Sequence, residues 1–430
     1  MSLHTAIEQA FETFQREAQR ANVILLHPHS RYRSLLLARL LSDDTSDAYY
    51  YAMRPDDTSL PAFINGLIRE MSGQHPSFGR HLNMLDQGIY DDYKKNMKEI
   101  LTAFIAELEE ISSSPFIFIL DEYDRSDNAD DLHRFIQQLT GHLPPQCRLV
   151  LNSRTLPRLP WVAMIARNQA ILLQDDMLIE KDFYNTYQDD NYNMQVYGLG
   201  SSSVYYQENQ ITNWEGHLPR LLFFFALDRP IVTRAEICHA FWPELGSDQA
   251  VNVFHVTKRR LHKAVGMDIL IHDTSYYQVS PTFNIRYDVM DFVELLMQGR
   301  NPQRSSEDRL ALWEQAEKLY QGPFLHGHRD AWILDRRAAF HEGYLETLIS
   351  IANIHQENNK GDVALQYFQK ALDDNYQRQD IHQSVMQLYA DMGRRPEAIK
   401  HYQNLEKTFN DKGIMIEPHT QQLYTDISAG

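Results

Sequence analysis

The chain has few cysteines and no apolar run long enough to cross a bilayer. Its two cysteines, Cys147 and Cys238, can form neither a disulfide framework nor a zinc site in a chain of 430 residues. The longest apolar runs, such as Phe116–Leu120 and Leu221–Leu227, are much shorter than the roughly 20 residues that span a membrane. No basic stretch followed by an apolar one opens the sequence, so we expect no signal peptide. These absences predict a cytoplasmic protein without membrane contact.

Residues that could carry out catalysis or hold a metal ion are also sparse. The 19 histidines form no helix-spaced pair with an acidic residue, as a metal site on a helix would need. The pairs His27/His29 and His326/His328 are spaced i, i+2 and are expected to be surface or locally hydrogen-bonded groups. We therefore predict that the protein is not an enzyme and has neither a metal site nor a cofactor.

The chain is acidic, with a net charge of −17, which by itself disfavours a nucleic-acid partner. The charge is uneven, however: residues 1–193 carry −10, residues 194–287 are neutral, and residues 288–430 carry −7. A neutral module with a local basic patch is expected to bind DNA weakly as a monomer and to lose affinity as salt rises. Binding as a homodimer or on repeated half-sites would compensate for that weakness.

Residues 194–287 carry, in order, the local signals of a winged helix-turn-helix. An apolar helical pattern from Trp214 to Leu227 predicts a first helix, and a break follows at Asp228-Arg229-Pro230. Thr233 and Glu236 then have the spacing of a capping box, which predicts that a second helix runs to Phe241.

A third helix and a hairpin complete this pattern. Ser247 is the expected N-cap of a helix that runs to about Val265 and ends at Gly266. Two strand-like runs follow, Asp268–His272 and Tyr276–Val279, and a short turn separates them. Such a pair predicts the hairpin that forms the wing.

The third helix provides the predicted DNA-binding surface. Four apolar residues at three-to-four spacing are expected to face the core: Val253, Val256, Leu261 and Ala264. Polar and basic side chains fall largely on other faces, where they can read base edges in the major groove and hold phosphates. Together with two residues that open the second helix, the candidate DNA-binding residues are Asn252, His255, Lys258, Arg259, Lys263, Arg234 and Thr233. An ordinary amphipathic surface helix is the alternative interpretation, and the capped helix and hairpin on either side argue against it.

The C-terminal third has the pattern of a helical repeat. Ala364, Phe368 and Ala371 correspond to Ala398, Tyr402 and Leu405, an offset equal to the 34-residue tetratricopeptide period. Each such repeat leaves an apolar face that only a neighbouring repeat can cover, so we expect a stacked array that recognises proteins.

This arrangement resembles the SARP-like regulators, in which a bacterial transcriptional activator domain follows an OmpR-type winged helix. The resemblance covers roughly residues 194–427. It is carried by Tyr320–Leu325 with Asp330-Ala331-Trp332, by His382, Met386, Leu388, Gly393, Ala398, Ile399 and Tyr402, and by Glu417–Thr420 with Leu423-Tyr424. It implies an activator that binds direct repeats in double-stranded DNA and contacts RNA polymerase or other transcription proteins.

Residues 1–175 alternate between apolar runs and helical patterns, which predicts an α/β domain with a parallel sheet. The expected strands are Val23–Leu26, Tyr49–Ala52, Phe116–Leu120, Arg148–Leu151 and Ala170–Leu173. This order resembles the P-loop ATPase domain of signal-transducing ATPase regulators of the maltose-regulon activator type. The resemblance places Asp121 after a Walker B strand and Arg154 at the position of a γ-phosphate sensor.

The phosphate loop departs from that family's pattern. The expected G-x-x-x-x-G-K-[ST] is replaced by residues 27–34, in which Ser34 alone matches and Arg33 stands in the place of the lysine. Both glycines are absent, although the loop amides need them to wrap a phosphate. We therefore predict a degenerate domain that senses or regulates, and Arg33, Ser34, Asp121 and Arg154 remain candidate nucleotide-binding residues.

The predicted chain is a multidomain α/β + α protein. It comprises a degenerate P-loop ATPase-like domain (1–175), a linker (176–193), a winged helix-turn-helix (194–287) and a tetratricopeptide-like activator domain (288–430). The predicted function is DNA-binding transcriptional regulation, and activation is the direction that the resemblance implies. Two alternatives remain open: a nucleotide-binding switch, and a scaffold whose winged helix binds protein instead of DNA.

Overall fold

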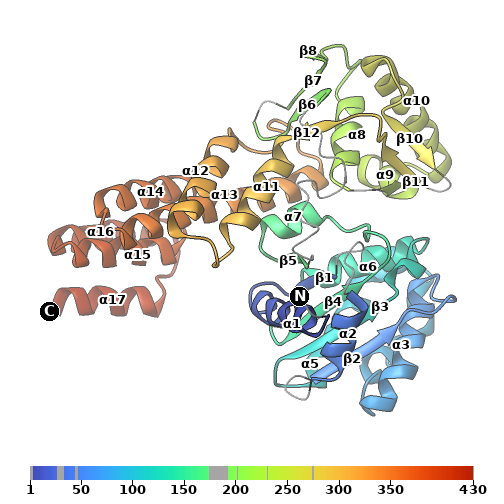
Figure 1. The fold of residues 1–430 in the computed structure, drawn as a ribbon, viewed down its shortest axis with the longest axis horizontal. Helices are drawn as coiled ribbons and strands as arrows, with labels where there is room; N and C mark the ends of the chain where they lie inside the picture. Colours follow the sequence, from blue (N-terminus) through green and yellow to red (C-terminus); the bar gives the residue numbers. More distant parts are fainter. Residues whose placement is uncertain are drawn as a thin grey trace. The chain divides into compact units, whose positions relative to one another are not determined.

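A computed structural model describes residues 3–26, 33–43, 47–173, 192–200, 202–229, 231–273 and 276–429 (Figure 1). The chain divides into two compact units. The first unit comprises residues 1–198, 203–287 and 328–335, and the second comprises 199–202, 288–327 and 336–430. The predicted linker 176–193 lies outside the described residues except for its last two positions. No helix among the described residues is long and apolar enough to span a membrane.

The first unit contains a five-stranded parallel sheet in the order β2-β3-β4-β1-β5. The strands are β1 (Val23–Leu26), β2 (Asp47–Ala52), β3 (Phe116–Asp121), β4 (Cys147–Asn152) and β5 (Ala170–Leu173). All five predicted strands are present, and the predicted fold class is confirmed. Since the strands are parallel, the residues that follow β3 and β4 meet at one edge of the sheet.

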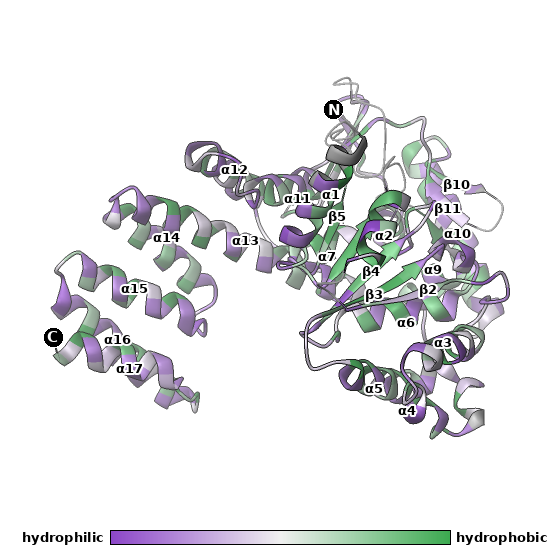
Figure 2. Ribbon diagram, turned by 60° about the horizontal axis from the view of Figure 1, so that its bottom comes forward, coloured by the Kyte–Doolittle hydropathy of each residue, from purple (hydrophilic) through white to green (hydrophobic). Residues whose placement is uncertain are grey.

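Helices cover both faces of this sheet (Figure 2). Alternate residues of β3 point to opposite faces: Ile117 and Ile119 pack with α1 (Leu3–Glu17) and α2 (Arg33–Leu41). Phe118 instead lies edge to face with Phe104, which also contacts Phe135. Phe104 and Phe135 belong to helices that cover the opposite face of the sheet. The remaining helices of this part are α3 (Leu60–Gln74), α4 (Arg80–Asn83), η1 (Gln87–Tyr90), α5 (Tyr93–Ile111), η2 (Tyr123–Ser126), α6 (Asp130–Thr140) and α7 (Trp161–Ala166).

The same unit contains the predicted winged helix-turn-helix. Its three helices are α8 (Leu218–Leu227), α9 (Arg234–Phe241) and α10 (Ser247–Val265). The hairpin β10 (Leu270–Asp273) and β11 (Tyr276–Val279) pairs with the short strand β9 (Val232–Thr233) in a three-stranded sheet. A second sheet, in the order β12-β6-β7-β8, contains β6 (Met194–Tyr197), β7 (Ser203–Tyr206), β8 (Asn209–Gln210) and β12 (Ile285–Tyr287).

Three expected boundaries in this region were wrong. The first helix begins at Leu218 and not near Trp214, because Pro219 occupies its first turn, where a proline is tolerated. The N-cap of α10 is Gly246, and Ser247 is the first helical residue. The first strand of the hairpin begins at Leu270 instead of Asp268, since the backbone N–H of Ile269 still donates to the carbonyl of Met267 after the end of α10.

The second unit is helical. Its elements are α11 (Asp288–Gly299), α12 (Ser306–Leu319), α13 (Ala331–Glu357), α14 (Gly361–Asp374), α15 (Gln379–Asp391), α16 (Arg395–Lys412) and α17 (Pro418–Ala429), with the first residues of α13 assigned to the first unit. The repeat residues Ala364 and Phe368 in α14, and Ala398 and Tyr402 in α16, are all buried, as the repeat predicts. The tetratricopeptide-like region is therefore confirmed.

Candidate functional site

Helix α9 begins at a complete capping box. The hydroxyl oxygen of Thr233 accepts a hydrogen bond from the backbone N–H of Glu236 (3.2 Å), and the Glu236 carboxylate accepts one from the N–H of Thr233 (2.7 Å). The predicted cap is thus confirmed, and such a cap typically contributes about 1 kcal/mol to helix stability. It fixes the start of the first helix of the helix-turn-helix pair.

Helix α10 buries one stripe of side chains against the winged-helix core. The buried residues are Ala250, Phe254, Thr257, Leu261 and Val265. Phe254 contacts the ring of Tyr277 in β11 at 4.9 Å between centroids, so the helix is held against the hairpin.

The predicted core face of this helix was partly wrong. Leu261 is buried, but Val256 is 44% exposed, and Val253 and Ala264 are only partly buried. Thr257 takes a core position because its hydroxyl donates to the carbonyl of Val253 (2.9 Å), which satisfies its polar group within the helix.

The opposite face of α10 contains most of the predicted DNA-binding side chains. Asn252, His255 and Arg259 are exposed. Lys258 is half-buried, with its ammonium 5.7 Å from the centroid of the Tyr277 ring. Lys263 forms an ion pair with Glu215, so its charge is partly neutralised. The structure therefore brings five predicted residues together on one helix.

The other two predicted residues lie at the start of α9. Arg234 is exposed, and Thr233 is half-buried. Thr233 already serves as the N-cap, and its hydroxyl also lies 3.4 Å from both carboxylate oxygens of Asp130, in α6 of the α/β part.

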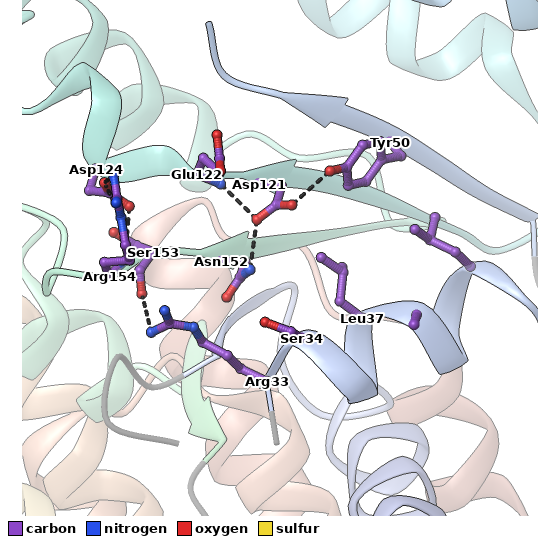
Figure 3. Close-up of a pocket in the computed structure, with 12 residues that line it drawn as sticks. Arg33, Ser34, Leu37, Tyr50, Asp121, Glu122, Asp124, Asn152, Ser153 and Arg154 are labelled. Carbon is purple, nitrogen blue, oxygen red and sulfur yellow. Dashed lines mark hydrogen bonds and ion pairs between the residues drawn. The ribbon is translucent and has the colours of Figure 1, made fainter. Parts of the chain in front are cut away.

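A pocket lies at the carboxyl ends of β3 and β4 (Figure 3). It has a volume of about 340 Å³, and all four predicted nucleotide-site residues line it: Arg33, Ser34, Asp121 and Arg154. Residues 27–32 of the predicted phosphate loop, 27–34, lie outside the described residues. The structure thus brings the four residues together at one pocket, and their role in binding a nucleotide stays a prediction.

The carboxylate of Asp121 is occupied by hydrogen-bond donors. It accepts from the Tyr50 hydroxyl (2.7 Å), the Asn152 side-chain amide (2.6 Å) and the backbone N–H of Glu122 (2.7 Å). Burial, followed by this hydrogen bond to Asp121, raises the pKa of Tyr50 above its ordinary value, so the hydroxyl stays protonated and remains a donor. A carboxylate with three such donors has little capacity left for Mg²⁺, which prefers oxygen ligands.

Arg154 is also engaged within the protein. Its guanidinium donates to the Asp124 carboxylate at 2.6 and 2.9 Å, and its backbone N–H donates to the same side chain at 2.9 Å. Arg33 donates to the carbonyl of Ser153 (3.2 Å). The described residues therefore do not fit a Mg²⁺-nucleotide site of the P-loop type, because the expected metal ligand and the expected sensor both bind partners of their own.

The side chain of Asn152 contributes a further polar group to the pocket. The side-chain oxygen of Asn152 is buried, and the described residues offer it no hydrogen-bond donor. In Figure 3 this oxygen points away from Asp121, into the space above Arg33 and Ser34. A bound donor group would satisfy it, since an unpaired buried oxygen costs roughly 1–3 kcal/mol.

A buried ion network joins the α/β part of the first unit to the winged helix, and the sequence did not predict it. The side chain of Arg158 is fully buried and donates to Asp130 (2.9 Å), Glu236 (2.9 Å) and the carbonyl of Asp127 (2.8 Å). Arg229 contacts the other oxygen of Glu236 at 3.3 Å. Burial alone lowers the pKa of Arg158, but the Glu236 and Asp130 carboxylates outweigh that effect and the net pKa is raised. These partners are distant in sequence, so no local pattern reveals them.

Two family models match parts of the chain. Residues 287–428 match the bacterial transcriptional activator domain, which confirms the predicted resemblance for the C-terminal region. Residues 31–154 match a family described as nephrocystin 3, N-terminal. No curated protein matches the chain in sequence.

Two solved structures are similar to this chain at low sequence identity. The first is Mycobacterium tuberculosis EmbR in complex with a low-affinity phosphopeptide, with 18% identity, a TM-score of 0.46, and coverage of 55% of this chain and 65% of EmbR. The second is a signal transduction ATPase with numerous domains and a tetratricopeptide repeat sensor from Pyrococcus horikoshii, with 11% identity, a TM-score of 0.23, and coverage of 97% and 66%. The alignments thus span about two thirds of either structure's length. Both TM-scores lie below 0.5, so neither similarity extends to function.

Proposed function

We propose that the chain is a transcriptional regulator that binds double-stranded DNA through its winged helix. The observation that carries the proposal is helix α10, which buries one stripe and exposes Asn252, His255 and Arg259 on another face. A capped helix precedes it and a hairpin follows it, as in helix-turn-helix proteins whose second helix lies in the major groove. The match of residues 287–428 to an activator domain supports the same function.

The contacts divide into two kinds. Asn252 and Arg259 are placed to read base edges, since Asn pairs well with adenine and Arg with guanine. Lys258, Lys263 and Arg234 are placed to hold phosphates, and these contacts position the protein without specifying sequence. The absence of net charge in residues 194–287 makes the affinity of one copy low. Paired copies on repeated half-sites raise it.

The remaining parts serve this DNA-binding module. Residues 288–430 contact RNA polymerase or other transcription proteins, as stacked helical repeats commonly bind proteins. Residues 1–175 form a regulatory domain that alters how the winged helix is presented, and residues 176–193 link the two. The cytoplasm is the compartment in which this function operates, and activation is the proposed direction of regulation.

The salt dependence of DNA affinity tests the proposed surface. The full chain is titrated with a random-sequence duplex between 50 and 200 mM salt. Removing one phosphate contact by Lys258→Ala should make the negative slope of log K against log salt shallower by about 1. Lys407→Ala, an exposed lysine of α16, is the matched control and should leave the slope unchanged. Equal slopes for both variants would place the phosphate contacts elsewhere.

A second candidate function is ligand binding in the α/β pocket. The unpaired oxygen of Asn152 beside Arg33 favours it, because one end of a ligand could donate to the amide oxygen while an anionic end binds the guanidinium. Titration with labelled ATP, with and without Mg²⁺, separates the possibilities. Saturable binding that requires Mg²⁺ and is lost in Arg33→Ala would support a nucleotide switch, whereas its absence would support a degenerate site.

A further inference from the structure

The α/β part covers the end of α9 that a helix-turn-helix turns toward DNA. In such a pair the first helix crosses the phosphate backbone while the second enters the major groove. The N-terminus of the first helix attracts anions, since its free N–H groups and helix dipole favour negative charge. In this chain the carboxylate of Asp130 lies at that end of α9, 3.4 Å from the Thr233 hydroxyl.

The cover extends to the wing. The hydroxyl of Tyr276, at the start of β11, donates to the side chain of Asn128 at 3.2 Å. The Arg158 guanidinium lies 5.8 Å from the centroid of the Tyr276 ring. The segment 127–131, which contains three aspartates, therefore faces both α9 and the wing. A phosphate backbone that approached the same surface would meet negative charge.

Arg158 holds the segment 127–131 against α9 and the wing. It reaches from the α/β part to the capping carboxylate Glu236, and its other contacts, to Asp130 and Asp127, tie it to the acidic segment. Gln137 of α6 adds a longer contact, 3.5 Å, to Arg229 of the winged helix. The junction is thus joined by ion pairs and hydrogen bonds.

A polar junction of this kind can open at modest cost. Buried ion pairs contribute little net stability, because the loss of hydration offsets most of their attraction. In addition, the Nε of Arg158 is buried without a hydrogen-bond partner among the described residues. Opening the junction would restore water to this atom.

We propose that the α/β part is a built-in competitor of DNA: Asp130 takes the place of a DNA phosphate at the start of α9, and Arg158 clamps it there. The inference rests on the proposed DNA-binding function and names the contact that regulates it. The occupant of the surface is this chain's own segment 127–131, and DNA binding requires its release.

The test compares DNA affinity of full-length variants. Arg158→Gln removes the clamp and Asp130→Asn removes the carboxylate charge while keeping its size. Arg54→Gln, which loses an ion pair with Glu70 on α3, is the control with the same loss of charge as the clamp variant. All four proteins are titrated with one duplex at fixed salt, with and without Arg259→Ala in the background.

If Arg158 holds Asp130 in place, the Arg158→Gln variant should bind DNA about tenfold more tightly than the wild type, a change of about 1.4 kcal/mol in binding free energy. This sign is diagnostic, because the simple loss of a cation would weaken binding to DNA. Asp130→Asn should also bind more tightly, Arg54→Gln should not, and Arg259→Ala should abolish the gain. Hydrogen exchange within 123–131 should become faster in the two variants and when DNA binds the wild type.

Other outcomes overturn the inference. Unchanged or weaker affinity of Arg158→Gln, with exchange in 123–131 unaffected by DNA, would contradict the clamp while leaving Arg259-dependent DNA binding intact. If Arg158→Gln fails to fold by circular dichroism, Asp130→Asn and the exchange data decide by the same criteria. DNA binding by none of the proteins, with no effect of Arg259→Ala, would instead contradict the proposed function itself.

Discussion

Single side chains at the junction illustrate how position changes the role of a residue. Glu236 was expected only as the third residue of a capping box, and it does cap α9. In the folded chain the same carboxylate also accepts from Arg158, which lies 78 residues earlier in the sequence. Local spacing predicts the first role because the cap is formed by adjacent turns. The second role depends on tertiary packing, which no local spacing encodes.

The burial of the Asp127 carboxylate makes the stability of the fold depend on pH. Burial raises its pKa to about 6, above the ordinary value of 3.8, although the Thr155 hydroxyl and Arg158 oppose the shift. Its charged form is therefore less favourable in the folded chain than in the unfolded chain above pH 6. Asp127→Asn should raise the free energy of unfolding at pH 8 by on the order of 1 kcal/mol, allowing for its partial exposure to solvent.

Denaturant unfolding from pH 8 to pH 4 measures this effect. The gain should shrink as pH falls below 6 and be small near pH 4, where this aspartate is protonated in the folded chain and about half protonated in the unfolded chain. Asp56→Asn, at an exposed position, is the control. A gain that stays constant across this range would show that charge burial is not its cause.

A histidine pair in the second unit gives the opposite pH dependence. His382 Nδ1 lies 2.8 Å from His401 Nε2, and His382 Nε2 lies 2.9 Å from the carbonyl of Tyr376, so both rings fit as neutral donors and acceptors. Burial, with the neighbouring His382, lowers the pKa of His401 to about 4 from 6.5. This pair should stabilise the fold fully above pH 6.5.

Stability should then fall by on the order of 2–3 kcal/mol as pH drops from 6.5 toward 4, because the unfolded chain takes up the proton first. Unfolding of α15 and α16 is followed by hydrogen exchange at pH 7.5 and pH 5. His401→Gln should reduce the difference between the two pH values. An equal difference in wild type and variant would exclude the pair as its source.

At the scale of helices and strands, the sequence predicts whether a segment is a helix or a strand better than it predicts which face is buried or where the element ends. The strands of the parallel sheet and the cap of α9 follow from strong local signals, apolar runs and a capping box. The predicted buried face of α10 is partly wrong, because hydropathy favours Val253 and Val256 over Thr257 for the core. The strands β6, β7 and β8 were not predicted, because runs of two to four residues carry little periodicity. Their order is set by pairing across the sheet.

The contact between α11 and α12 can be tested by a single methyl group. A Cβ on Gly299 would lie 2.7 Å from the Trp313 ring, which is itself buried. Gly299→Ala should therefore destabilise the second unit by about 1–3 kcal/mol through overpacking. Thermal and denaturant unfolding measure the change.

Gly361→Ala, in α14 of the same unit, is the matched control. Its added Cβ would meet the flexible side chain of Met392, which can move aside, so the expected cost is below about 1 kcal/mol. Equal costs for the two variants would contradict close packing of Gly299 against the indole.

At the scale of the whole molecule, the units do not follow the chain in order. Residues 328–335 lie within the segment expected to form the C-terminal domain, yet they pack with the first unit. Trp332 contacts Phe225 and Phe241 of the winged helix at 5.1 and 5.9 Å between ring centroids. The sequence could not show this, because an apolar residue in a helix does not reveal which core it enters. Likewise, the sequence predicts residues that line the α/β pocket, but it does not predict the three hydrogen bonds that the Asp121 carboxylate accepts.

If α10 reads DNA sequence, the full chain should select particular sites from fragmented host DNA. The purified full chain is incubated with the fragments at two salt concentrations, and the retained DNA is sequenced. We expect a repeated motif that is enriched by the wild type and by Lys407→Ala but lost with Arg259→Ala. Retention of no motif at low salt, or of the same motif by Arg259→Ala, would contradict it.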